Sequence, residues 1–190
     1  MLIRNATVIL PAGQTAADLL LAGGTVAKIG AGLEAPKDDE TVDASGKWVL
    51  PGLIDCHVHF REPGLEHKAT MATEAASAAA GGVTTVCEMP NTIPPTVTVA
   101  ALADKVRKSN LIEGCDLRFY FGATEAAHLF TLRELWSGSA GEFQRLKARC
   151  SGLKLYLDHS TGNQKVDGGI VEEIFQACKD LGIPLIAHCE

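Results

Sequence analysis

The chain has 190 residues, of which 46% are hydrophobic and 21% are charged, and its formal net charge is −6. This composition excludes a disordered chain, and the negative charge argues against a general nucleic-acid or anionic-membrane surface. No apolar run reaches transmembrane length, and Met1 is not followed by a signal-peptide pattern. Six scattered cysteines without a Cys-x-x-Cys pair predict reduced thiols in a cytoplasmic protein rather than a disulfide framework.

Residues 1–50 are predicted to form a small β layer. Leu19–Ala22 runs into Gly23-Gly24, a hairpin-type turn, and Thr25–Ile29 follows. A further short strand is expected at Trp48–Leu50. Because this part carries little helix signal, we expect it to be a domain of its own.

From residue 51 onward, strand-like segments alternate with segments of helical composition. This alternation implies a parallel sheet, either an open doubly wound sheet or a closed barrel. A partly helical region is expected between the third and fourth strands. Strands are expected at 54–60, 83–87, 116–122, 152–157 and 184–188, and helices at about 66–80, 97–110 and 169–181.

The polarity of the strands favours the barrel. Leu153 and Leu155 share one face of their strand, whereas Lys154 and Tyr156 share the other, and His188 ends the last strand. Functional groups at the C-terminal ends of strands with an apolar outer face are typical of a TIM barrel. We therefore predict an α/β fold, a partial (β/α)8 barrel over residues 51–190, and we expect the chain to be the N-terminal part of a longer protein.

The segment after Cys56 carries the first candidate site. On a continuous strand, His57, His59 and Arg61 point one way, and the apolar residues between them point the other. Two imidazoles and a guanidinium on one face suit a divalent metal with an anion beside it. The alternative is a surface strand with two unrelated histidines.

Two later residues also have alternative roles. Lys154 lies among leucines, where a lysine normally extends its amine to water or pairs with a carboxylate. Beside a metal, a neutral lysine can instead react with carbon dioxide, and the carbamate that forms can bridge two metal ions. His188 is either a hydrogen-bonded core histidine or a metal ligand.

Four motifs together resemble the dihydroorotases of the amidohydrolase superfamily. They are Pro51-Gly52-Leu53-Ile54-Asp55 with His57-x-His59-Phe60-Arg61-Glu62-Pro63-Gly64, Met89-Pro90-Asn91-Thr92, Gly152-Leu153-Lys154-Leu155-Tyr156, and Ala187-His188-Cys189-Glu190. The resemblance covers the chain from about residue 40 to its end. It implies a (β/α)8 barrel with a small β-sandwich assembled from both chain ends.

The resemblance also implies a metal centre with two zinc ions. His57 and His59 would hold one zinc, carboxylated Lys154 would bridge the pair, and His188 would help to hold the second. The family's further histidine ligand and its general acid/base, an aspartate, are expected beyond residue 190. The other three histidines, His67, His128 and His159, match no ligand position and are expected in loops or at the surface; His159 lies nearest in sequence to Lys154.

By the same resemblance, Arg61 and Asn91 would bind the carboxylate of the substrate. Arg61 would do so through a two-pronged ion pair. For Asn91 the competing interpretation is a turn residue, because the segment around it is rich in prolines.

The implied reaction interconverts dihydroorotate and N-carbamoyl-aspartate in pyrimidine biosynthesis. An allantoinase or hydantoinase would share the metal site, but Arg61 and the Met-Pro-Asn-Thr motif favour a substrate with an exocyclic carboxylate. A metal-free, non-catalytic partner of aspartate transcarbamoylase is a third possibility, and the intact ligand set argues against it. We expect a cytoplasmic homodimer, with or without aspartate transcarbamoylase, that binds a small-molecule substrate and neither nucleic acid nor membrane.

Overall fold

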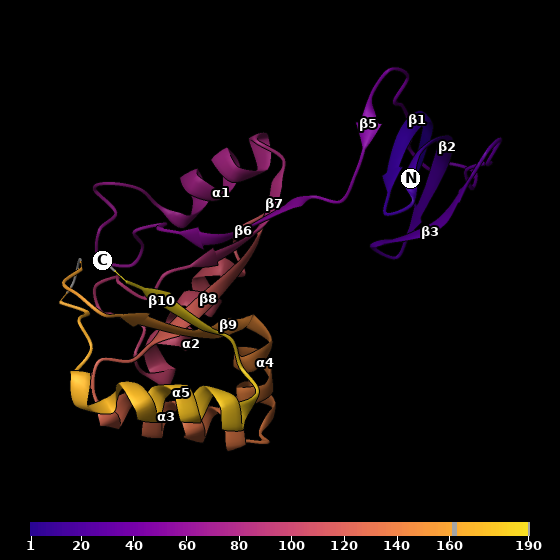
Figure 1. Cartoon of the computed structure of the whole chain (residues 1–190). Helices are drawn as coiled ribbons and strands as arrows, with labels where there is room; N and C mark the ends of the chain where they lie inside the picture. Colours follow the sequence, from indigo (N-terminus) through magenta and orange to yellow (C-terminus); the bar gives the residue numbers. More distant parts are fainter. Residues whose placement is uncertain (161–162, 190) are drawn as a thin grey trace. The chain divides into compact units, whose positions relative to one another are not determined.

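The computed structural model describes residues 1–160 and 163–189, and the chain divides into two compact units, Met1–Pro51 and Gly52–Glu190. The first unit contains only strands, and the second combines strands with helices (Figure 1). The elements of each unit follow from its own sequence pattern.

The first unit is a single sheet of five strands. Its strands are β1 (Leu2–Leu10), β2 (Gly13–Ala22), β3 (Thr25–Gly30), β4 (Thr41–Asp43) and β5 (Trp48–Val49). β2 pairs antiparallel with β1 and with β3, and β4 and β5 pair parallel with β1. The hairpin between β2 and β3 turns at Gly23 and Gly24, whose φ angles of 57° and 75° are left-handed. Glycine adopts such angles without steric cost, as the predicted turn requires.

The second unit is a parallel sheet with helices. Its strands are β6 (Leu53–Val58), β7 (Val83–Glu88), β8 (Asp116–Gly122), β9 (Cys150–Tyr156) and β10 (Leu185–His188). Its helices are α1 (Met71–Ala80), α2 (Val99–Ser109), α3 (Ala126–Ser137), α4 (Gly141–Arg149) and α5 (Val171–Leu181), and a short 3-10 turn, η1 (Gly168–Ile170), precedes α5. Every strand pairs in parallel with its predecessor in the sequence.

The strand order and the curvature of this sheet distinguish a barrel from a doubly wound sheet. The order β10-β9-β8-β7-β6 never reverses, whereas a doubly wound sheet changes direction at a switch point. In a flat sheet, the two edge strands would lie about 19 Å apart, given a strand spacing of about 4.8 Å. Yet the rings of His57 on β6 and His188 on β10 have centroids 6.3 Å apart. The sheet therefore curls, as the predicted partial barrel requires (Figure 1).

The core of this unit lies between the outer face of the sheet and the helices. Leu153 and Leu155 are fully buried in it, and Lys154 and Tyr156 face the inside of the curl. This alternation confirms the prediction for β9. The core also contains Val86, Leu102, Leu117, Phe119, Phe121, Leu129, Leu132, Leu135 and Ile174.

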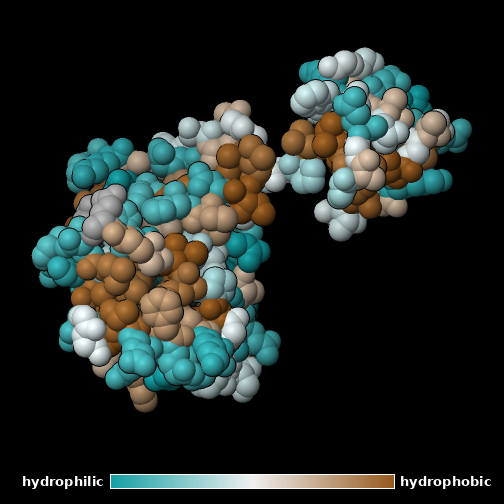
Figure 2. Space-filling model, viewed as in Figure 1, coloured by the Kyte–Doolittle hydropathy of each residue, from teal (hydrophilic) through white to brown (hydrophobic). Residues whose placement is uncertain are grey.

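The apolar face predicted for residues 54–60 is only partly buried. Val58 and Phe60 pack against the core, but Ile54 is 64% exposed and Leu53 is 54% exposed. β6 is an edge strand, so no neighbouring strand covers its free side. Apolar side chains accordingly reach the surface of this unit (Figure 2).

The helix predicted to begin near residue 66 begins at Met71. Thr70 caps it, because its hydroxyl accepts a hydrogen bond from the backbone N–H of Thr73 and the Thr73 side chain reaches back to the Thr70 backbone. The helix ends at Gly81, as predicted. All six cysteines are free thiols, and no helix in the described residues has the length and apolarity that crossing a membrane requires.

Candidate metal centre

Three of the predicted ligands converge at the C-terminal ends of strands. His57 lies on β6, Lys154 on β9 and His188 at the end of β10, and β10 pairs with β9 so that Ile186 is opposite Lys154. The ring centroid of His57 lies 5.4 Å from that of His59 and 6.3 Å from that of His188. The curl of the sheet thus brings both edge strands to one mouth.

The strand argument for His59 and Arg61 was wrong. β6 ends at Val58, so both residues lie in the following loop, and Arg61 has a left-handed φ of 66°. A turn begins there, because the backbone N–H of Leu65 donates to the carbonyl of Arg61. Arg61 therefore owes its position to this turn rather than to strand alternation.

Asn91 fixes the orientation of His59. Asn91 is buried, and its Oδ1 lies 2.9 Å from Nδ1 of His59. An amide oxygen only accepts hydrogen bonds, so Nδ1 of His59 carries the proton and Nε2 keeps its lone pair. Metal-binding histidines are commonly oriented in this way. Asn91 is thus more than a turn residue.

Partial or full removal from water lowers the pKa of His57, His59 and Lys154, which favours their neutral forms. It lowers the pKa of both His57 and His59, and the positive charge of Lys154 lowers them further. Burial also lowers the pKa of Lys154, which is 1% exposed. Neutral imidazoles bind metal ions, and a neutral amine reacts with carbon dioxide, whereas the protonated forms do neither.

The Nζ of Lys154 has no hydrogen-bond partner among the described residues. A buried amine without a partner costs free energy, and such groups are rare in folded proteins. In the same part of the chain, no three His, Cys, Asp or Glu side chains form a metal-binding group. A carbamate on Lys154 would supply the missing oxygen ligands beside the imidazoles. The residues present therefore fit a metal centre built on a modified lysine.

Tyr156 lies beside this group, and the sequence analysis did not include it in the site. Its ring centroid is 4.9 Å from Nζ of Lys154 and 5.7 Å from the ring of His188. Burial raises the pKa of its hydroxyl, the charge of Glu88 raises it further, and the charge of Arg61 lowers it. Its spacing of two residues from Lys154 was the signal that could have identified it.

A buried ion pair supports the loops that carry the site, and it too was missed. Nζ of Lys105 on α2 lies 2.7 Å from Oε2 of Glu88 at the end of β7, and both side chains are 1% exposed. The same amine donates to the carbonyl of Met89 at 3.3 Å, two residues before Asn91. The sequence did contain a signal for this pair, because Lys105 lies on the same helix face as the apolar Leu102 and Val106, where a lysine is expected to be buried and paired.

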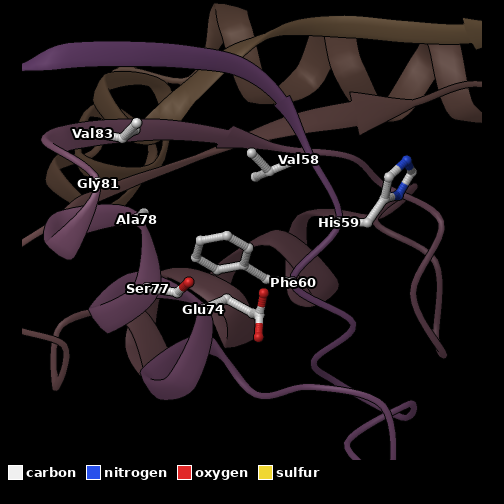
Figure 3. Close-up of a pocket in the computed structure, with 8 residues that line it drawn as sticks. All are labelled: Val58, His59, Phe60, Glu74, Ser77, Ala78, Gly81 and Val83. Atoms are coloured by element: carbon white, nitrogen blue, oxygen red, sulfur yellow. The ribbon is translucent and has the colours of Figure 1, made fainter.

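A small pocket lies beside the loop after β6. It has a volume of about 250 Å³ and is lined by Val58, His59, Phe60, Glu74, Ser77, Ala78, Gly81 and Val83. In Figure 3 the ring of Phe60 lies over α1, whereas the ring of His59 points away from it. The pocket therefore borders on His59, one of the proposed ligands, and its other lining residues belong to β6, α1, β7 and the segments that join them.

The remaining histidines lie elsewhere. His67 and His159 are exposed, and the backbone N–H of His159 donates to Asp158. His128 is half-buried on α3, where its Nδ1 accepts from the backbone N–H of Thr124 at 3.2 Å. Among the described residues, none of the three has a ring contact with His57, His59 or His188.

Comparison with known proteins gives a consistent set of relatives. A sequence model of the amidohydrolase family matches residues 48–190. The dihydroorotase of Methanosarcina acetivorans is 33% identical over 188 residues, which is 99% of this chain and 38% of that protein. The dihydroorotase of Geobacter sp. (strain M21) is 36% identical over 193 residues, 100% of this chain and 42% of that protein.

A solved structure of the L-hydantoinase (dihydropyrimidinase) from Arthrobacter aurescens also matches. It superposes with a TM-score of 0.85 and 31% identity, and the match covers 100% of this chain and 40% of that one. The chain thus spans about two fifths of the length of these relatives.

Proposed function

The chain belongs to the amidohydrolase family, and we propose that the protein containing it hydrolyses a cyclic amide, interconverting dihydroorotate and N-carbamoyl-aspartate. The observation that carries this proposal is the convergence of His57, Lys154 and His188 at the mouth of the curled sheet. The relatives named dihydroorotase make that reaction the first candidate.

The metal centre is proposed to use the four predicted ligands. His57 and His59 would hold one zinc ion, His188 would help to hold a second, and carboxylated Lys154 would bridge them. When bound, such a pair of ions supplies Lewis acidity and lowers the pKa of a water molecule. The chain's own contribution is to lower the pKa of His57 and His59 by desolvation, which favours neutral imidazoles, and to orient His59 through Asn91.

Arg61 and Asn91 are proposed to hold the substrate carboxylate. Arg61 is half-buried, so its guanidinium is partly removed from water, which strengthens an ion pair. Asn91 uses Oδ1 for His59 and keeps its Nδ2 donors for the ligand. Fixing the carboxylate places the reacting carbonyl at a defined position over the site, which lowers the entropic barrier.

Hydantoinase activity is the second candidate, because the L-hydantoinase structure matches the whole chain at a TM-score of 0.85. Hydantoin lacks the carboxylate that Arg61 would bind, and that difference separates the two candidates. A non-catalytic partner of aspartate transcarbamoylase would need neither the neutral lysine nor the converging histidines.

Steady-state kinetics of the full-length protein with dihydroorotate, allantoin and hydantoin tests the proposal. We expect dihydroorotate to have the highest kcat/KM by at least roughly tenfold, the discrimination that one charged contact provides. Faster hydrolysis of hydantoin would support the second candidate, and hydrolysis of none of the three would refute both. The expected cytoplasmic homodimer, and association with aspartate transcarbamoylase, are testable by ultracentrifugation of the same sample.

A further inference from the structure

The segment that leads from β7 to Asn91 is buried, so its backbone groups need partners inside the protein. Residues 86–92 are all buried, and Met89 among them is fully removed from solvent. The N–H of Met89 has a partner, because it donates to the carbonyl of Val58 at 3.0 Å. A buried backbone carbonyl also requires a donor, and no water reaches this one from the solvent. The donor to the carbonyl of Met89 is therefore part of what fixes this segment.

Lys105 on α2 is that donor. Its Nζ donates to the carbonyl of Met89 at 3.3 Å and to Oε2 of Glu88 at 2.7 Å. The same amine lies 5.6 Å from the centroid of the Phe119 ring, within the range of a cation–π contact. One ammonium group thus joins α2 to β8, to the last residue of β7 and to the first residue after it.

Stability alone does not account for charged groups at this place. The side chains of Lys105 and Glu88 are each 1% exposed, and replacing a buried ion pair by apolar side chains of similar volume is often neutral or stabilising. An apolar side chain cannot supply a directional bond to a backbone carbonyl. The specific contribution of Lys105 is therefore to fix the carbonyl of Met89, and with it the direction in which the chain leaves β7.

That direction determines where Asn91 lies. Asn91 follows Met89 by two residues, is 4% exposed, and its Oδ1 lies 2.9 Å from Nδ1 of His59. A hydrogen bond of this length tolerates little displacement before it is lost. A shift of the backbone at Met89 would therefore release the imidazole of His59 from the orientation in which Nε2 is free for a metal ion.

We propose that Lys105 is a positioning residue of the metal centre, which acts through the carbonyl of Met89 on Asn91 and thereby on the imidazole of His59. This inference rests on the proposed function, because it requires His59 to be a metal ligand. Groups that orient ligating histidines typically contribute tenfold to a hundredfold to metal affinity. Lys105 acts one step further away, so its removal should weaken metal binding by roughly tenfold in protein that remains folded.

The test uses E88Q/K105M in the full-length protein, a variant that removes both charges together and leaves no unpaired carboxylate in the interior. The metal-free protein, in bicarbonate buffer and without substrate, is titrated with Zn²⁺ in competition with a chromophoric chelator. Circular dichroism and urea unfolding verify that each variant is folded. We expect the dissociation constant for Zn²⁺ to rise roughly tenfold relative to the native protein. An unchanged dissociation constant, with native protein that binds Zn²⁺, would refute the role of Lys105 alone.

K147M is the matched control. Lys147 on α4 also donates to two backbone carbonyls, those of Trp136 at 3.2 Å and Gly138 at 2.9 Å. The neighbouring carbonyl of Ala148 accepts from Arg118 near the start of β8, so these contacts lie at the end of the sheet opposite to the metal centre. K147M should lose stability but keep the native affinity for Zn²⁺. Equal losses of affinity in K147M and E88Q/K105M would indicate a general loosening of the fold and would overturn the proposal.

A mutant cycle with Asn91 tests the route. N91A removes the amide that orients His59, and its affinity for Zn²⁺ should fall roughly tenfold to a hundredfold. If Lys105 acts through Asn91, adding E88Q/K105M to N91A should weaken binding little further, because residues that act on one another are not additive. Losses that multiply would show that Lys105 acts elsewhere and would refute the proposal. Native protein that binds no Zn²⁺ would refute the proposed metal centre itself, and this inference with it.

Discussion

Replacement of Lys105 by methionine should cost about 3–5 kcal/mol of folding free energy at neutral pH, because it leaves a buried carboxylate without its counter-charge. Lys105 and Glu88 are each 1% exposed and 2.7 Å apart, so water cannot replace the lost partner. Oε1 of Glu88 already has no hydrogen-bond partner among the described residues. A loss of that size lowers the folding equilibrium constant roughly a hundredfold to a few thousandfold.

The folding free energy that K105M loses relative to the native protein, its stability deficit, should depend on pH. Burial already raises the pKa of Glu88 above its usual 4.5, and without Lys105 the pKa rises further. A group whose pKa is raised on folding contributes stability below the unfolded pKa and loses it as the pH rises through the folded pKa. The deficit relative to the native protein should therefore be small near about pH 4.5 and reach its full size near about pH 7.5.

Urea unfolding of the full-length protein at both pH values measures this effect. The control is K108M on the same helix, whose lysine is 28% exposed and lies 3.8 Å from Glu62. A long, partly solvated pair of this kind contributes only about 0–1 kcal/mol. E88Q/K105M should recover part of the lost stability, since a neutral amide is cheaper to bury. Equal deficits in K105M and K108M, or a deficit independent of pH, would refute the reasoning.

Three further outcomes are expected. R61A should weaken substrate binding by about 2–5 kcal/mol, seen as a raised KM with native metal content, and an unchanged KM would remove Arg61 from the site. The metal content should fall as the pH drops below about 6.5, because protonated His57 and His59 do not bind metal, and dialysis at stepped pH followed by elemental analysis measures it. Residues 1–190 expressed alone should be catalytically silent and poorly monomeric, because β6 and β10 are open edges and β6 has exposed apolar residues. A stable monomer that hydrolyses dihydroorotate at an ordinary rate would contradict this.

The sequence was sufficient to predict the α/β fold of residues 51–190 because its signals are local. The alternation of Leu153 and Leu155 with Lys154 and Tyr156 defines two faces of one strand. The turn at Gly23-Gly24 and the left-handed backbone of Gly82, just after α1, follow from glycine's backbone freedom. These features depend on neighbouring residues only, and the structure has them where they were expected.

The missed features depend on contacts between distant segments. The end of β6 at Val58 is set by the turn that begins at Arg61, and a strict alternation over residues 54–60 cannot reveal it. Lys105 and Glu88 are 17 residues apart and meet only because α2 packs on β7 and β8. The exposure of Ile54 reflects its edge strand, which strand polarity alone does not indicate.

The central claim is that the buried amine of Lys154 becomes part of a metal centre. Elemental analysis of the full-length protein and of its K154A variant tests it most directly. Both proteins are purified in the presence of bicarbonate, and circular dichroism is used to verify that both are folded. The native protein should retain a pair of metal ions and K154A should lose most of the metal, together with dihydroorotate hydrolysis. Native protein without tightly bound metal, or a K154A variant with the native metal content, would contradict the claim.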